Sequence, residues 1–267
     1  MRKHHIRLLI VALLTVSLAS CTGKKNKENA QENAAAQAGL ISKAVLTEEL
    51  KSETVQLLKD MPDSDIPQRI AAGEITIGLA NFDYMLPTAT AAEATSSLQK
   101  ARALGVFLAD YNLLKVLGQP VEEVEAALTK LASDLDVTFI LNNRAGSPTE
   151  PLDFRSQQEN IINTLAEKDK IDIAVEILGG IIVENACLYA NPSLVVKGDV
   201  TYAETLSTNM LKRFDIIGEV IDDLATYYPD LKGLRETIAP LGDKLSSVNV
   251  ARAARADIID VRNKLLN

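Results

Sequence analysis

Apolar residues recur at intervals of three and four along most of the chain after Thr47, and this helical spacing is the strongest constraint on the fold. The clearest example runs from Thr88 to Leu117, where Gly118 and Pro120 stop it. No segment alternates apolar and polar residues convincingly enough to predict a half-buried strand. The sequence therefore predicts an all-α domain, a multi-helix bundle whose short connections favour antiparallel neighbours.

The helix boundaries follow from caps and helix breakers. Thr47 supplies an N-cap ahead of the acidic residues Glu48 and Glu49, and Pro67 suits a first helical turn. The loop at residues 146–151 is a candidate boundary between two halves of the domain. Helices are expected over residues 47–61, 67–79, 88–117, 121–135, 137–143, 154–166, 168–190, 200–228, 230–241 and 249–266.

The first 21 residues have the pattern of an exported, lipidated protein. Three basic residues within the first seven precede an apolar run at 8–18, which is too short to span a bilayer. The motif Leu18-Ala19-Ser20-Cys21 resembles the lipobox of bacterial lipoproteins. The resemblance implies removal of a signal peptide at residues 1–20 and acylation of Cys21, with palmitate among the acyl chains. A plain secretory signal with an unrelated cysteine is the alternative interpretation.

The polar and alanine-rich residues 21–40 have no apolar stripe to bury, so they are expected to form a flexible tether behind the lipid. Residues 41–267 remain for the helical domain. The lysines of the tether, Lys24, Lys25 and Lys27, are suited to contact with anionic lipid headgroups.

Removal of the leader also removes every histidine, because His4 and His5 are the two histidines of the chain. The mature protein then has no serine–histidine triad, histidine-ligated zinc or Glu-x-x-His di-iron site. It has 25 basic and 36 acidic residues, a net charge of −11, which argues against a nucleic-acid partner. No cofactor or metal site is predicted. Cys187 lies in an apolar helical segment, where we expect a buried thiol with a raised pKa.

Two apolar segments share a glycine followed by a carboxylate five residues later, at positions that differ by 74. They are Leu104-Gly105 with Asp110 and Leu178-Gly179 with Glu184. Glycine in a helix interior suggests close approach of two backbones, and the similarity indicates either a duplicated unit or coincidence. The candidate ligand pocket between these helices comprises Gly105, Asp110, Tyr111, Gly179, Glu184, Asn185 and Tyr189.

Residues 103–111 and 128–135, together with the glycine-glycine segment at 178–184, resemble a group of uncharacterised helical lipoproteins of Bacteroidetes. The resemblance covers residues 67–245 and brings no catalytic residues. In such bacteria, surface export tends to follow an acidic run after the lipidated cysteine. The lysines that stand there instead imply a body facing the periplasm, anchored in the outer membrane.

Three functions are compatible with these patterns. The first is a non-catalytic interaction or scaffold domain, held at the membrane through Cys21 and acting on an envelope protein partner. The second is a binder of an apolar or lipid-like ligand between the glycine-bearing helices. The third is an enzyme that uses Asp110 and Glu184 as an acid–base pair, which requires the two carboxyls to converge in one cavity.

Overall fold

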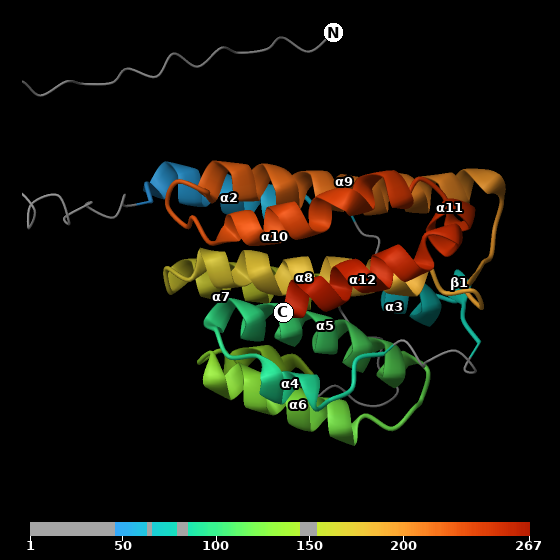
Figure 1. The fold of residues 1–267 in the computed structure, drawn as a ribbon, viewed down its shortest axis with the longest axis horizontal. Coiled ribbons are helices and arrows are strands. Elements are labelled where there is room, and N and C mark those ends of the chain that lie inside the picture. Colours follow the sequence, from blue (N-terminus) through green and yellow to red (C-terminus); the bar gives the residue numbers. More distant parts are fainter. Residues whose placement is uncertain (1–45, 63–65, 79–84, 145–153) are drawn as a thin grey trace, which may run out of the picture. The chain divides into compact units, whose positions relative to one another are not determined.

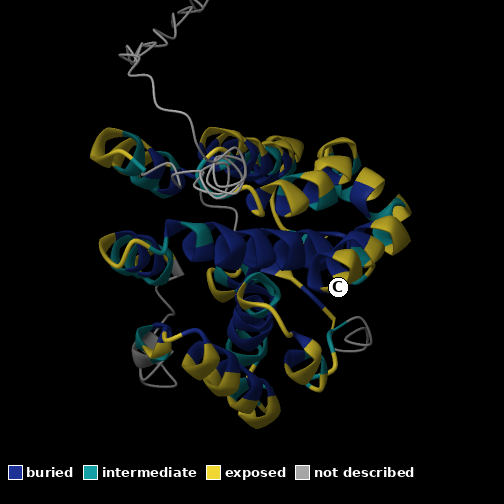
Figure 2. Cartoon of the chain, turned by 60° about the vertical axis from the view of Figure 1, so that its left-hand side comes forward, coloured by how far each residue is buried: buried dark blue, intermediate teal, exposed yellow. Residues whose placement is uncertain are grey.

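Helix α8 (Ile171–Tyr189) runs through the middle of the helical domain and is buried over its whole length (Figure 2). The computed structural model describes residues 46–62, 66–78, 85–144 and 154–267. The predicted leader, Cys21, the tether and the boundary at 146–151 lie outside the described residues. Contacts join Ala44–Asn267 in one compact unit.

The other described elements surround α8 in layers (Figure 1), and the prediction of an all-α multi-helix bundle is confirmed. One side is covered by α2 (Glu48–Lys59), α9 (Val200–Leu224) and α10 (Leu231–Ile238), and the other by α4 (Thr90–Glu93), α5 (Ser97–Val116) and α6 (Glu122–Asp134). Helices α7 (Phe154–Glu167) and α12 (Arg255–Leu266) pack against α8 itself. Shorter elements are α3 (Ile66–Ala71), β1 (Ile75–Thr76), η2 (Thr138–Arg144), β2 (Val195–Val196), η3 (Ala239–Lys244) and α11 (Val248–Ala253).

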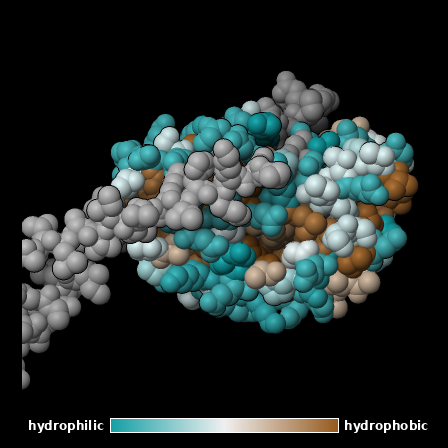
Figure 3. Space-filling model, turned by 90° about the horizontal axis from the view of Figure 1, so that it is seen from above, coloured by the Kyte–Doolittle hydropathy of each residue, from teal (hydrophilic) through white to brown (hydrophobic). Residues whose placement is uncertain are grey.

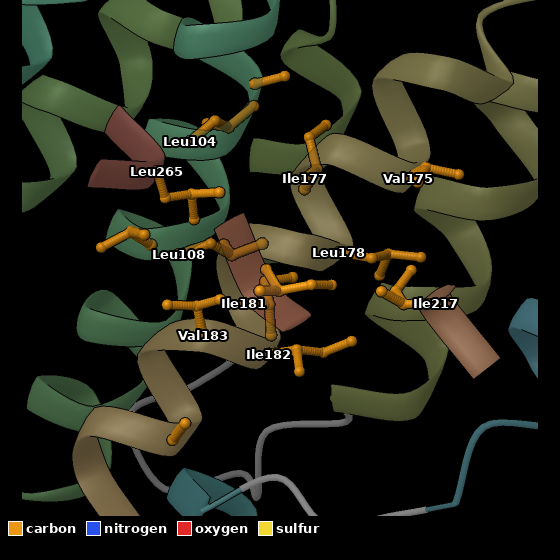
Figure 4. Packing of buried hydrophobic residues seen from close by; sticks show 14 of the residues in the cluster. Leu104, Leu108, Val175, Ile177, Leu178, Ile181, Ile182, Val183, Ile217 and Leu265 are labelled. Carbon is orange, nitrogen blue, oxygen red and sulfur yellow. The ribbon is translucent and has the colours of Figure 1, made fainter. Parts of the chain in front are cut away.

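Helices α5 and α6, which follow each other in sequence, are antiparallel, whereas α5 and α8 run in the same direction. The start of α5 meets the end of α6 through an ion pair between Lys100 and Asp134, 2.8 Å apart. In contrast, Leu104 and Leu108 of α5 descend beside Ile177 and Ile181 of α8 in Figure 4. This parallel pair makes the most extensive contact between any two described elements.

Two glycines allow α5 and α8 to approach until their backbones touch. A Cβ on Gly105 would lie 2.0 Å from the carbonyl oxygen of Ile177, and one on Gly180 would lie 2.3 Å from the carbonyl oxygen of Arg102. No larger residue fits either position without separating the helices. The sequence prediction of close approach between the glycine-bearing helices is therefore confirmed at the backbone level.

Aliphatic side chains fill the space on both sides of this glycine contact (Figure 4). Leu104, Ile177 and Leu265, from α5, α8 and α12, are each completely buried. Burial of a side chain of this size stabilises a fold by about 1.5–3 kcal/mol. Residues of α5, α8 and α12 thus belong to one buried hydrophobic cluster at this contact.

The helix expected over 67–79 was predicted too long. It ends at Ala71 because Gly73 adopts a φ of +74°, and the N–H groups of Gly73 and Glu74 close the helix on the carbonyls of Ile70 and Arg69. The next residues form β1, which pairs antiparallel with β2. The absence of strands was therefore a wrong prediction for this short ladder, and residue 79 lies outside the described ranges.

The segment 88–117 was also wrongly predicted as one helix. It divides into α4 and α5 because Ser96 and Gln99 form a capping box, in which each side chain accepts a hydrogen bond of 3.1 Å from the other's backbone N–H. The helix predicted over 230–241 divides into α10 and η3, and the helix predicted over 249–266 divides into α11 and α12. The helix predicted over 137–143 is the 3₁₀ helix η2. The remaining helices begin and end within a few residues of expectation.

The glycine contact makes a stability prediction. We expect Gly105→Ala to lower the free energy of unfolding by about 3 kcal/mol, since overpacking must push α5 away from α8. Urea unfolding followed by circular dichroism measures this loss. Gly233→Ala in α10 is the matched control, because its Cβ would meet its nearest neighbour only at 3.9 Å and alanine favours a helix. Equal effects at the two positions would contradict the role assigned to the α5–α8 contact.

Candidate functional site

The parallel direction of α5 and α8 brings Asp110 and Glu184 together in the core. Both side chains are completely buried, and the carboxyl of Glu184 acts directly on that of Asp110. Each lies beyond the glycine contact, at equivalent points of the two segments that differ by 74 positions. The two candidate acid–base residues therefore converge, as the carboxylate hypothesis requires.

Helix α12 contributes a third charged group, Arg262. Its Nη1 atom lies 3.4 Å from Oε2 of Glu184, and the residue is 3% exposed. The buried face of α12 also carries Ile258, Val261 and Leu265, so Arg262 occupies a position within an apolar stripe. Sequence analysis missed this residue, although a charge inside an apolar stripe is the signal that could have identified it.

Burial dominates the electrostatics of this cluster, which comprises Asp110, Glu184 and Arg262. Burial raises the pKa of Asp110 well above its usual value, the negative charge of Glu184 raises it further, and Arg262 only partly offsets both. The pKa of Glu184 is also raised by burial, while Arg262 acts to lower it. Asp110 is therefore the carboxyl that holds a proton more strongly, and Glu184 is the natural partner of the guanidinium.

Cys187 lies one helical turn beyond Glu184 and matches its prediction. The residue is 1% exposed, and its thiol lies 4.0 Å from the carbonyl oxygen of Ile258. Burial raises the pKa of the thiol well above its usual value, and the charge of Glu184 raises it further. A buried neutral thiol of this kind is a poor nucleophile, because the thiolate is the reactive form.

The other polar candidates are directed to different neighbours. Asn185 joins α8 to α3, because its Oδ1 accepts a hydrogen bond of 2.7 Å from the N–H of Ile66 and its Nδ2 donates one of 2.9 Å to the carbonyl of Ile181. Tyr189 forms a hydrogen bond through its hydroxyl with Ser207 of α9. These two side chains fasten neighbouring elements to α8.

The remaining residues of the predicted ligand pocket are Tyr111 and the glycines. Tyr111 is buried, and the Nζ of Lys115 lies 5.8 Å from the centre of its ring, a cation–π contact within α5. Gly179 does not face α5, since a Cβ there would lie 2.9 Å from Cδ2 of Leu234 in α10. Its neighbour Gly180 makes the contact with α5 instead. The structure thus brings Asp110 and Glu184 together and distributes the other candidates around α8.

A second ion pair, with a fully buried carboxyl and a partly buried guanidinium, lies on the other side of the glycine contact. Arg102 of α5 binds Glu176 of α8 through two hydrogen bonds, Nε to Oε2 at 2.5 Å and Nη2 to Oε1 at 2.9 Å. Burial raises the pKa of Glu176, while Arg102 acts to lower it. These residues also differ by 74 positions, so equivalent points of α5 and α8 meet at both ends of their contact.

A surface pocket of about 360 Å³ lies between α9, α10 and η3. Gly218 of α9 leaves room for the side chain of Arg235, whose Nε lies 3.6 Å from Oδ1 of Asp222. The wall of the pocket carries four carboxylates and one guanidinium, a combination that favours cationic partners. Its lining residues are Phe214, Asp215, Glu219, Asp222, Asp223, Arg235, Ile238, Ala239 and Gly242.

Comparison with known proteins gives no family to which these sites could be assigned: no family model, curated protein or solved structure matches the chain. In the part of the chain that the structure describes, no group of three histidine, cysteine or carboxylate side chains is placed to hold a metal ion. Among the same residues, no helix is long and apolar enough to cross a membrane.

The buried cluster predicts how its members depend on each other. Arg262→Met leaves Glu184 without its cation in the core, and we expect the free energy of unfolding to fall by about 3–5 kcal/mol at neutral pH. The double variant Arg262→Met/Glu184→Met removes both charges and should recover most of that loss. Denaturant unfolding of the single and double variants measures the coupling.

Lys264 on the same helix provides the control. It forms an exposed pair with Asp260 at 2.7 Å, so Lys264→Met should change the free energy of unfolding by less than about 1 kcal/mol. If Arg262→Met is as mild as this control, the guanidinium does not compensate the Glu184 charge.

Proposed function

We propose that the chain is an envelope lipoprotein, anchored through Cys21 in the outer membrane and facing the periplasm, whose helical domain acts without catalysis through contact with a protein partner. The observation that carries this proposal is the complete burial of the Asp110–Glu184 pair. The two carboxyls that could have formed an acid–base site have no exposed surface at which a substrate could meet them.

The enzyme hypothesis requires two carboxyls close together and a route by which a substrate can reach them. Asp110 and Glu184 meet the first requirement but not the second. A reacting group must come within hydrogen-bond distance of a general acid or base. Around Asp110, the neighbouring space is occupied by α8 and α12, which supply Glu184 and Arg262. Catalysis at this pair would require α5, α8 and α12 to separate first.

The apolar-ligand hypothesis meets a similar obstacle. The backbones of α5 and α8 touch at Gly105 and Gly180, and the aliphatic side chains beside them are fully buried. A ligand between these helices would have to replace that packing. The observations therefore favour protein contact at the surface over binding inside the bundle.

The pocket between α9, α10 and η3 is the contact surface that we assign to this function. Its rim carries the exposed carboxylates of Asp215, Glu219 and Asp223, while Phe214 and Ile238, which also line it, are buried. On the side of the domain shown in Figure 3, hydrophilic residues surround smaller hydrophobic areas. A basic segment of an envelope protein fits these exposed carboxylates.

Anchoring is tested at Cys21. We expect Cys21→Ser to move the full-length protein from the membrane fraction to the soluble envelope fraction and to abolish incorporation of labelled palmitate, since two or more acyl chains are needed for stable anchoring. Cys187→Ala is the matched control and should leave both unchanged. Retention of the Cys21→Ser protein at the membrane would exclude lipidation as the anchor.

The contact surface is tested by crosslinking in intact cells. A photoreactive residue in place of Gly242, whose Cβ would meet nothing within 4 Å, should give a discrete adduct with an envelope protein. Replacement of Asp215, Glu219 and Asp223 by their amides should lower the adduct yield about tenfold, because three rim charges together contribute about 1–2 kcal/mol.

Helix α6 supplies the control for this experiment. Glu122 and Glu123 are exposed there, on the other side of the bundle from α9 (Figure 1), and their amide variants should leave the adduct unchanged. Equal loss with both sets of variants would indicate a response to net charge alone. An adduct insensitive to the pocket variants would remove this surface from the proposal.

A further inference from the structure

The Asp110–Glu184–Arg262 cluster has an imbalance of charge that the proposed function does not explain. Two carboxyls face one guanidinium, and all three residues are at most 3% exposed. With every group ionised, the core between α5, α8 and α12 would hold a net charge of −1. An unbalanced buried charge costs several kcal/mol, and proteins usually avoid it by changing the protonation state of one group.

The hydrogen bonds of the cluster show the same imbalance. Oε2 of Glu184 faces Nη1 of Arg262, but Oε1 of Glu184 and both oxygens of Asp110 receive no hydrogen bond from any donor in the described ranges. Two ionised carboxylates can only accept. A proton on one of them turns their contact into a hydrogen bond, and it satisfies a buried oxygen on each side.

We propose that Asp110 and Glu184 hold one proton between them in the folded protein, so that the cluster is electrically neutral. Asp110 carries the proton and donates it to Oε1 of Glu184, while Glu184 remains ionised opposite Arg262. The cluster is then a specific proton-binding site at the contact of the three central helices. Loss of this proton places two negative charges side by side and weakens the contact of α5 with α8.

The groups around the cluster are consistent with this assignment. Besides Glu184, α8 contributes Cys187, whose thiol stays neutral because burial raises its pKa. Helix α12 contributes Arg262 and, at longer range, Arg255. The charged group of α3, Arg69, binds Glu74, and the contact of α7 with the polar face of α5 is made by the uncharged Gln157, which accepts from Asn112. Only Glu184 and Arg262 act on Asp110 among the described charges.

The direction of the pH effect follows from the raised pKa of Asp110. In the unfolded chain this carboxyl ionises near pH 4, but in the folded protein it keeps its proton to higher pH. The folded state therefore binds one more proton than the unfolded state in that interval. Its folding equilibrium constant falls by up to tenfold per pH unit until the folded pKa is reached, and this contribution is constant above it.

Infrared spectroscopy of the whole folded protein tests the proton directly. At neutral pH we expect the carbonyl band of a protonated carboxylic acid, and we expect its loss in both Asp110→Asn and Glu184→Gln. The loss in Glu184→Gln is the more specific test, because this variant still contains the carboxyl of Asp110. With Glu184 neutralised, that carboxyl ionises opposite Arg262 and the band disappears. Glu159→Gln, the partly exposed member of the Arg155–Glu159 pair, is the control and should retain the band.

Denaturant unfolding over a series of pH values provides an independent measurement. In wild type, the folded state binds one more proton than the unfolded state, whereas in Asp110→Asn and Glu184→Gln this difference should disappear. The folding constant of each variant should therefore fall with pH less steeply than that of wild type, by about tenfold per pH unit. Absence of the infrared band from the wild type, its persistence in both variants, or parallel pH profiles would overturn the proposal. The infrared experiment needs only native protein, so it decides the question even where a variant unfolds irreversibly.

Discussion

The contact between the backbones of α5 and α8 determines where the buried carboxyls of the described residues lie. Gly105 and Gly180 remove the side chains that would keep the helices apart, and the parallel direction of the pair places residues 74 positions apart opposite each other. Arg102 meets Glu176 on one side of the contact, and Asp110 meets Glu184 on the other. Neither meeting would occur at the wider spacing that larger residues impose.

Local patterns were sufficient to predict the fold class, because helical spacing and capping are properties of short segments. The side chain of Thr47 accepts from the N–H of Leu50 as an N-cap should, and α6 and α7 lie nearly where expected. The predicted helix boundaries were wrong where a local backbone conformation ended or started a helix although the apolar spacing continued. Gly73 ended α3 early, and the Ser96 capping box started a new helix inside an apparently continuous stripe.

The candidate site was only partly predictable, since its third member comes from a distant segment. Asp110 and Glu184 follow equivalent glycines, so their meeting could be suggested from the sequence. Arg262 lies 78 residues beyond Glu184, and no local rule places α12 against α8. The choice between Gly179 and Gly180 depends on the rotation of α8 about its axis, which a helix that is apolar on all sides does not reveal.

The Arg102–Glu176 ion pair and the Asp110–Glu184 carboxyl pair also explain how the mainly aliphatic interface between α5 and α8 keeps one alignment. Side chains around α8 are apolar on every face, so aliphatic packing alone distinguishes weakly between helix positions one turn apart. A shift of α5 by one turn would separate Arg102 from Glu176 and leave the fully buried carboxyl of Glu176 without its cation. The same shift would separate Asp110 from Glu184, which share the proton proposed above. The polar groups thus penalise the wrong alignment more than they stabilise the right one. A rigid body of this kind can present the α9–α10 surface in one fixed shape to a partner.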